Sequence, residues 1–293
     1  MRTDICREND RLLFVQHAQL RQVKEMGALK QKALRAEKSM HSVAVKQIRD
    51  TITVRSSMTY VTLGAILVAF LFSCVHHPLS KNGTLTEKII EAYGGRERLA
   101  KIVAVQAEGQ ITALMRGGEG TYARTFRRDG KLLVDISYAQ LSEKRILNGN
   151  KGFRSTGGQV EEVFGPRYQA MVYQYNELNL PYGFIDNSLT VAELRRDTLN
   201  GADVIVLQCT DRAGNEMLVF VNAESYRIVK SLDVFDMGGQ TTSLSAEFSD
   251  FRVVGGVLFP FRIVNYAGGR KISETIITRY AVNPPLNDSL FTP

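Results

Sequence analysis

The chain has no tryptophan, only three cysteines and only four histidines among its 293 residues. The cysteines are Cys6, Cys74 and Cys209, and no histidine lies beyond His77. The region after residue 77 therefore has no pair of cysteines for an internal disulfide, no Ser-His-Asp or Cys-His arrangement and no histidine to ligate a metal. We expect no metal and no other cofactor there.

Motifs for nucleotide-dependent chemistry are also missing. There is no Walker A sequence and no GxGxxG that opens a helix after a strand. The paired carboxylates Glu161-Glu162 could serve as acid and base, but they follow Gly157-Gly158, which is typical of a solvated turn. Cys209 lies in the strand-like run 204–210, where a lone cysteine is typical of a small buried apolar residue. We predict that the protein is not an enzyme.

The positive charge is concentrated at one end of the chain. The formal net charge is +7, and residues 1–57 contribute +6 of it, with 12 Lys+Arg against 6 Asp+Glu. Residues 58–293 are nearly neutral, with 25 against 24. This larger region lacks the basic surface that nucleic-acid binding requires, so we expect no nucleic-acid partner.

Long hydrophobic runs are absent as well. The most apolar run, Val61–Phe72, makes about 18 Å of helix, whereas a bilayer span takes about 20 residues. Arg55 precedes it, as in a secretory signal, and the run leads into Leu71-Phe72-Ser73-Cys74, which resembles a bacterial lipobox. We predict that residues 54–74 are a lipoprotein signal, that Cys74 is lipidated, and that 75–83 form a tether. A transmembrane anchor and a buried core helix are the alternatives.

Residues 1–53 precede this signal and have two interpretations. They are polar, rich in Lys, Arg and Gln, and 20–34 can be drawn as an amphipathic helix. They could be a basic helical or disordered extension, acting as a cytoplasmic arm or a nucleic-acid-binding tail. Alternatively, the gene model starts too early and the working protein begins at Val54 or Met58. We favour the second interpretation and expect 1–53 to be dispensable.

Residues 84–293 are predicted to form one domain, mainly β with a smaller helical part. Thr84 and Glu87 form a capping-box pattern that begins a helix, and Gly94-Gly95 ends it. Period-two alternation follows from Val103 to Ala113 and again over 243–249, which is typical of antiparallel strands with one dry face. The first run places Val103 on the dry face, and the second places Ser245 on the wet face. Turn dipeptides separate such runs, at 117–118, 129–130, 148–149, 157–158, 200–201, 238–239, 255–256 and 268–269. We expect a curved antiparallel half-barrel of about ten strands.

One helix is predicted to interrupt the strands. Met171, Tyr175 and Leu178 recur at helical spacing, and Pro181 ends the pattern. An apolar stripe in a meander of strands has to be buried, and the concave face of the sheet is the available surface. The stripe has two interpretations, ordinary core packing or a mobile plug over an apolar cavity.

Four segments with turn-and-strand signatures complete the pattern: Ile90–Leu99, Leu147–Ser155, Gly256–Ile263 and Asn283–Phe291. Together they resemble the LolA/LolB-like superfamily of envelope lipoprotein carriers, in particular its outer-membrane lipoprotein-sorting relatives. The resemblance implies a strongly curved half-barrel with helices packed in its concave face, which binds acyl chains or other apolar ligands without chemistry on them. Phe153 stands where relatives often carry tryptophan.

The resemblance also implies partners and a location. We expect a monomeric lipoprotein in the cell envelope, facing the periplasm and held on the membrane by its lipidated N-terminus. Val75 rather than aspartate follows the cysteine, which favours the outer membrane. The alternative is an interaction or sensor module of the same fold with a filled core. The two differ in whether six large side chains line an empty cavity or interdigitate at core density, namely Met171, Tyr175, Phe220, Phe235, Phe248 and Phe261.

Overall fold

The computed structural model describes residues 84–114, 118–236 and 241–293. The predictions for the extension 1–53, the signal 54–74 with Cys74, and the tether 75–83 lie outside the described residues. Within the described residues, no helix has the length and apolar character needed to cross a membrane.

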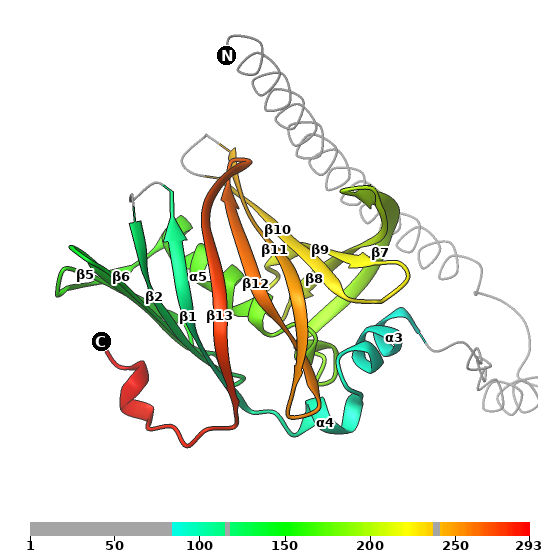
Figure 1. The fold of residues 1–293 in the computed structure, drawn as a ribbon, viewed down its shortest axis with the longest axis horizontal. Coiled ribbons are helices and arrows are strands. Elements are labelled where there is room, and N and C mark those ends of the chain that lie inside the picture. The colour runs from blue at the N-terminus through cyan, green and yellow to red at the C-terminus, as the bar shows by residue number, and fades with distance from the viewer. Residues whose placement is uncertain (1–83, 115–117, 237–240) are drawn as a thin grey trace, which may run out of the picture. The chain divides into compact units, whose positions relative to one another are not determined.

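The described strands form one antiparallel sheet of 13 strands (Figure 1). The first half of the chain provides β1 (Ala104–Ala113), β2 (Gly118–Arg127), β3 (Lys131–Tyr138), β4 (Ser142–Asn148), β5 (Lys151–Thr156) and β6 (Gln159–Val163). The second half provides β7 (Leu189–Leu199), β8 (Ala202–Asp211), β9 (Glu216–Asn222), β10 (Ile228–Asp236), β11 (Thr241–Val254), β12 (Val257–Ala267) and β13 (Arg270–Val282). The expected fold class, a mainly β, curved antiparallel half-barrel, is confirmed.

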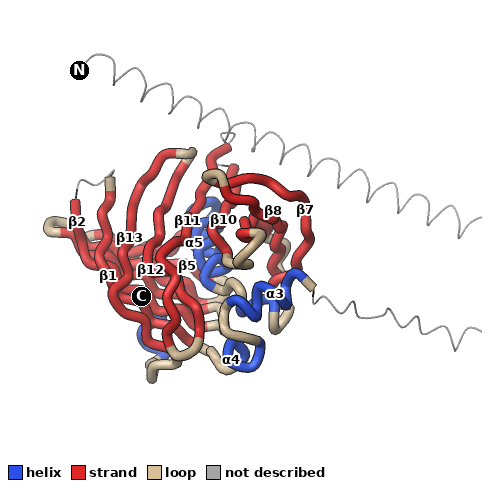
Figure 2. Tube along the Cα trace, turned by 45° about the vertical axis from the view of Figure 1, so that its right-hand side comes forward, coloured by secondary structure: helices blue, strands red, loops and turns tan. Residues whose placement is uncertain are grey.

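The connectivity explains why a helix lies inside the curve. The two halves are successive hairpins that meet where β1 pairs with β13, so β6 and β7 are the two edges of the sheet. Helix α5 (Gly165–Leu178) and the short 3-10 helix η1 (Tyr182–Phe184) connect these edges. The sheet has two wings, β1–β6 and β7–β13. α5 contacts β4 and β5 of the first wing and β10 of the second. The sheet therefore curves around the helix, as Figures 1 and 2 show.

Tight turns set the hairpins where the sequence predicts them. Asn200-Gly201, Gly255-Gly256, Gly268-Gly269 and Gly157-Gly158 all have positive φ at both positions, between 51° and 87°. Two successive residues in this region make the type I′ turn whose twist matches that of paired strands. The turn positions are confirmed, except for 238–239 and 117–118, since 238, 239 and 117 lie outside the described residues.

Two small helices, α3 (Leu85–Ala92) and α4 (Arg96–Ala100), lie at one end of the sheet (Figure 2). The predicted N-cap is confirmed, because the Thr84 hydroxyl accepts a hydrogen bond from Glu87 N at 3.3 Å. After α3, Gly94 has φ +120°, and a Cβ there would lie 2.3 Å from Gly256 O. Only glycine permits this approach, which lets Tyr93 O accept a hydrogen bond from Leu258 N at 3.1 Å. The helix end thus packs on the β11–β12 hairpin.

The C-terminal segment ties the end of the chain to the first strand. Asn283 Oδ1 accepts hydrogen bonds from Val103 N at 2.8 Å and Ala104 N at 3.2 Å, and its Nδ2 donates to Lys101 O at 2.8 Å. The short helix η2 (Asp288–Phe291) then contacts β3 and β4, where Phe291 is fully buried. These contacts give the Asn283–Phe291 motif a structural role.

Three details of the sequence prediction are wrong. The sheet has 13 strands rather than about ten, because edge strands such as β6, with four exposed residues out of five, lack the alternation that marks a half-buried strand. Val103 precedes β1 and is 58% exposed. Ser245 is buried instead of wet, because its cross-strand partners Leu232 and Tyr266 flank it with large side chains.

Candidate functional site

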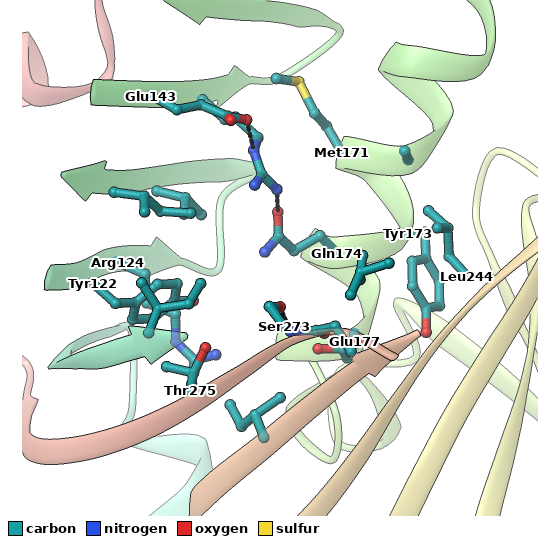
Figure 3. Close-up of a pocket in the computed structure, with 18 of the residues that line it drawn as sticks. Tyr122, Arg124, Glu143, Met171, Tyr173, Gln174, Glu177, Leu244, Ser273 and Thr275 are labelled. Carbon is teal, nitrogen blue, oxygen red and sulfur yellow. Dashed lines mark hydrogen bonds and ion pairs between the residues drawn. The ribbon is translucent and has the colours of Figure 1, made fainter. Parts of the chain in front are cut away.

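A cavity of about 300 Å³ lies between α5 and the concave face of the sheet (Figure 3). Strands β1–β6 provide one side of its wall and β11–β13 the other, and α5 forms the remaining side. The helix therefore does not fill the curve of the sheet at core density.

The sheet side of the cavity combines aliphatic side chains with polar and charged ones. Ile111 pairs with Thr275, which pairs with Ile263 on the next strand, so these three side chains point to the same face of the sheet. The same face continues into the first wing, and the apolar lining is made by Ile111, Val134, Ile136, Val163, Met171, Leu244, Ile263 and Ile272.

Close packing holds the start of the helix on the first wing. A Cβ on Gly152 of β5 would lie 2.9 Å from Met171 Sδ and 3.0 Å from Val163 Cγ2. The missing side chain at Gly152 thus makes room for Met171, which is buried. Met171 lines the cavity from α5, as Figure 3 shows.

Polar contacts hold the middle of the helix on the other wing. The Tyr173 hydroxyl lies 2.7 Å from Ser231 Oγ of β10, and Ser231 donates a hydrogen bond to Glu177 Oε2 at 2.9 Å. Burial raises the pKa of Glu177 above its ordinary value, while Ser231, Arg124 and Tyr173 lower it in part. Burial likewise raises the pKa of Tyr173 far above its usual range. Burial therefore shifts both groups toward their protonated forms.

A buried arginine faces this group from the sheet. Arg124 is 8% exposed, and its Nη2 donates to the Tyr280 hydroxyl at 3.3 Å. Although burial lowers the pKa of Arg124, the phenols of Tyr122 and Tyr280 and the Glu177 carboxyl raise it overall. Arg124 thus stays charged beside the cavity.

A second, smaller cavity of about 60 Å³ continues beyond this point. Arg124, Glu177 and Ile263 line both cavities and therefore separate them. The rest of the smaller wall is mainly apolar or aromatic, including Phe126, Leu178, Phe248 and Phe259.

Tyr175 anchors the C-terminal half of α5 at the β2–β3 turn. Its hydroxyl donates to Arg128 O at 2.7 Å and accepts from Gly130 N at 3.1 Å. The ring lies 5.2 Å, between centroids, from that of Phe126. Burial raises the pKa of Tyr175 to about 12. Tyr175 borders neither cavity and instead packs as a fixed contact of the helix.

The six side chains proposed from the sequence are distributed over different places. Met171 lines the larger cavity and Phe248 the smaller one. Phe235 packs edge-on against Tyr173 at 6.1 Å, and Phe261 packs against Tyr280 at 5.1 Å. These two belong to the same buried core as Met171 without lining either cavity.

Phe220 lies on the opposite face of the sheet. It pairs with Lys230, whose neighbour Ser231 points toward α5, so Lys230 and Phe220 point away from the helix. Lys230 Nζ lies 5.9 Å from the centroid of the Phe220 ring. The structure therefore brings Met171 and Phe248 to the cavities and separates Phe220 from them.

Sequence reasoning missed the charged residues of the cavity. Arg124 has the same strand parity as Tyr122 and Phe126, and all three point inward. A charged residue at an inward position of an alternating strand could have indicated these sites, since a charged side chain is buried only when it is paired with another group or has a function. The same signal holds for Glu143 and Arg145 on β4, which also line the larger cavity. Glu177 shares the face of α5 that carries Tyr173.

The prediction for Cys209 is confirmed. The thiol is free and fully buried in the core of the described domain. Burial raises its pKa to about 12. It is therefore an unreactive packing residue.

Together, the fold and the cavity define a class of protein: a curved antiparallel half-barrel with a helix across its concave face and a partly apolar space beneath it. The sequence matches no family model, and no curated protein matches it.

Several solved structures are similar to this chain. A LolA superfamily protein from Nitrosomonas europaea has 17% identity and a TM-score of 0.46, over 71% of this chain and 96% of that protein. A domain assigned to outer membrane lipoprotein sorting from Vibrio parahaemolyticus has 13% identity and a TM-score of 0.46, over 71% and 94%. A DUF1329 family protein from Desulfovibrio piger has 11% identity and a TM-score of 0.48, over 71% and 95%.

Proposed function

We propose that this protein is a binding protein of the cell envelope that holds an acyl chain, or another apolar chain, between α5 and the concave face of its sheet. The observation that carries the proposal is the cavity of about 300 Å³, whose wall includes a group of aliphatic side chains from β1, β3 and β12. Burial of apolar surface supplies the affinity, at about 0.8 kcal/mol for each methylene group. No covalent step on the ligand is part of the proposal.

The size of the space favours a single chain. Ligand pockets of about 300–1,000 Å³ are usual, so this cavity is at the small end of that range. The smaller cavity, of about 60 Å³, extends the apolar path beyond Glu177 and Arg124. One chain lying along both cavities fits this geometry, whereas a bundle of chains would require α5 to move away from the sheet.

Filling the cavity tests the proposal. Ala170 lines the larger cavity from α5, while the neighbouring Gln169 is exposed. We expect Ala170→Phe to weaken displacement of a fluorescent fatty acid at least tenfold, because the new ring occupies the space of the chain. The matched control Gln169→Phe adds the same ring outside the cavity and should leave the affinity unchanged. Equal affinities for both variants would contradict the proposal, and an absence of binding by the wild type would favour the module with a filled core.

We further propose that Cys74 attaches the protein to the membrane, in the outer membrane rather than the inner one. The lipobox-like Leu71–Cys74 and the short apolar run before it support this step. Stable attachment requires more than one acyl chain, as single chains bind membranes only marginally. A role in carrying lipids or lipoproteins to the outer membrane is consistent with such an anchor.

Metabolic labelling tests the anchor. A clickable palmitate analogue should label the wild type and leave Cys74→Ser unlabelled, and only the wild type should sediment with outer-membrane fractions. The control Cys6→Ser removes a cysteine from the extension 1–53 and should be labelled like the wild type. Equal labelling of Cys74→Ser would rule out this attachment point.

A further inference from the structure

The larger cavity has a charged side that an acyl chain alone does not explain. Arg145 of β4 and Arg154 of β5 pair across the strands and both line the cavity. They share one carboxylate, that of Glu143, which is 7% exposed. Arg145 Nε lies 2.8 Å from Glu143 Oε1, and Arg154 Nη2 lies 3.3 Å from Oε2. Figure 3 shows Glu143 and Gln174 on either side of the guanidinium that bridges them.

The charges on this side do not balance. Three guanidinium groups, of Arg145, Arg154 and Arg167, lie near two carboxylates, that of Glu143 and that of Glu161, the cross-strand neighbour of Arg154, which leaves one positive charge in excess. Among the described residues that line the cavity, four are arginines and two are glutamates, and no lysine, aspartate or histidine joins them. Arg167 is directed to Glu161 at the rim, where it is 64% exposed. The excess positive charge is therefore greatest around Arg145 and Arg154.

One donor in this group lacks a partner. Arg154 Nε is buried and makes no hydrogen bond, although the Arg154 side chain as a whole is 26% exposed. Buried donors in native proteins nearly always have a partner, so Arg154 Nε is a donor available to a bound group. A guanidinium presents its N–H groups in a planar fork that matches the oxygens of a phosphate or carboxylate.

Arg145 and Arg154 lie on one side of the cavity and aliphatic side chains of the central strands lie beyond them, with Arg124 and Glu177 at the boundary with the smaller cavity. Arg145 and Arg154 belong to the outer strands β4 and β5, while Ile111 and Ile263 belong to the central strands β1 and β12. Ile263 also borders the smaller apolar cavity. A molecule with one charged end and one apolar chain would match this order, with its chain running from β4–β5 toward the centre of the sheet.

We infer that the ligand is an anionic amphiphile, a single-chain lipid whose phosphate or carboxylate headgroup is held by Arg145 and Arg154. The inference rests on the proposed function and specifies its ligand. Glu143 holds the two guanidinium groups in position and Gln174 of α5 holds Arg145, at 3.3 Å. The helix that covers the chain thus also orients the headgroup site.

Two single-chain lipids with the same acyl chain test the inference. Lysophosphatidylglycerol carries an anionic phosphate, whereas the corresponding monoacylglycerol is neutral and has neither phosphate nor carboxylate. We expect the wild-type protein to bind the anionic lipid at least tenfold more tightly in displacement of a fluorescent fatty acid, with the difference falling as salt is raised. Inorganic phosphate serves as a third competitor, and we expect it to displace no probe at concentrations that saturate the lipid site.

Variants assign the preference to the two arginines. Arg145→Gln and Arg154→Gln should each reduce the ratio of the affinity for the anionic lipid to that for the neutral lipid severalfold. Arg154→Lys keeps the charge and should retain part of the preference, which an effect on folding alone would not do. The control Arg262→Gln removes the same charge from the opposite face of β12, where Arg262 pairs with Glu274, and should retain the full preference.

The possible results distinguish failure of the headgroup site from failure of acyl-chain binding. Equal binding of both lipids by the wild type would overturn the headgroup site and leave the apolar cavity standing. Displacement of the probe by inorganic phosphate alone would overturn the lipid interpretation in favour of an ion site. Binding of neither lipid would remove the proposed function as well.

Discussion

The hydroxyl of Tyr175 offers a direct test of whether α5 is fixed or moves when ligand enters. It donates to Arg128 O at 2.7 Å and accepts from Gly130 N at 3.1 Å. Tyr175→Phe leaves the ring in place and removes both hydrogen bonds. A buried backbone group that loses its partner costs about 1–3 kcal/mol. Because Tyr175 is only partly buried and water can reach the turn, we expect a loss of about 1–2 kcal/mol for the pair.

Urea unfolding measures this loss. With a slope of about 2 kcal/mol per molar urea, the midpoint should fall by about 0.5–1 M. Tyr175→Ala also removes the ring contact with Phe126 and should cost about 3 kcal/mol, near the low end for truncating a buried aromatic residue. Tyr168→Phe is the matched control, since no hydrogen bond joins its hydroxyl to another described residue, and its midpoint should not change.

Ligand affinity decides between a fixed helix and a mobile plug. Since Tyr175 borders neither cavity, a fixed helix predicts that Tyr175→Phe binds a fluorescent fatty acid within about twofold of the wild type. If α5 has to leave the sheet before ligand enters, destabilising the closed state by about 1–2 kcal/mol should tighten apparent binding by about 5- to 30-fold. Such tightening would refute the fixed helix, and an unchanged urea midpoint would refute the hydrogen-bonded anchor itself.

Three further predictions concern stability and reactivity. Burial raises the pKa of Glu177, so the stability that its protonated form contributes is fully present below the unfolded pKa and is lost as pH rises through the folded pKa. Between pH 5 and pH 8, Glu177→Gln should therefore lose less free energy of unfolding in urea melts than the wild type. Parallel curves for the two proteins would contradict this. Gly152→Ala should cost about 1–3 kcal/mol, because the new methyl would lie 2.9 Å from Met171 Sδ. Gly118→Ala, with no atom within 4 Å of the new Cβ, should cost far less, and equal losses would reject the packing argument. Burial raises the pKa of the Cys209 thiol to about 12, so iodoacetamide should leave it unmodified in the native protein and modify it in 8 M urea. Mass spectrometry of the Cys209 peptide measures both. Labelling of the native protein would mean that the strand opens.

Local features of this fold follow from the sequence because their causes are local. Paired residues of positive φ, such as Gly255-Gly256 and Asn200-Gly201, are set by a turn that few residues permit. The start of α3 depends on the Thr84 hydroxyl, three residues from the N–H that it satisfies. The helix that begins at Gly165 is predicted by its spacing and ends before Pro181. These elements could be located without tertiary information.

The face that each side chain occupies depended on contacts between distant segments. Alternation assigns residues to two faces of a strand, but it does not say which face is concave. A register irregularity between Ile228 and Lys230 further shifts the parity of β10 relative to β9, so the position of Phe220 could not be obtained by counting. Tyr175 has helical spacing with Met171, yet it reaches the β2–β3 turn instead of the cavity.

The charged side of the cavity came only from the tertiary structure. Arg124, Arg145 and Glu177 are scattered over β2, β4 and α5, and the pairing of β1 with β13 is what brings the second half of the chain around them. The sequence by itself determined the turns, the central helix and the antiparallel class, since each depends on neighbours along the chain. The cavity and its arginines were decided by how the sheet curves around a helix that connects its two edges, which is a property of contacts far apart in the sequence.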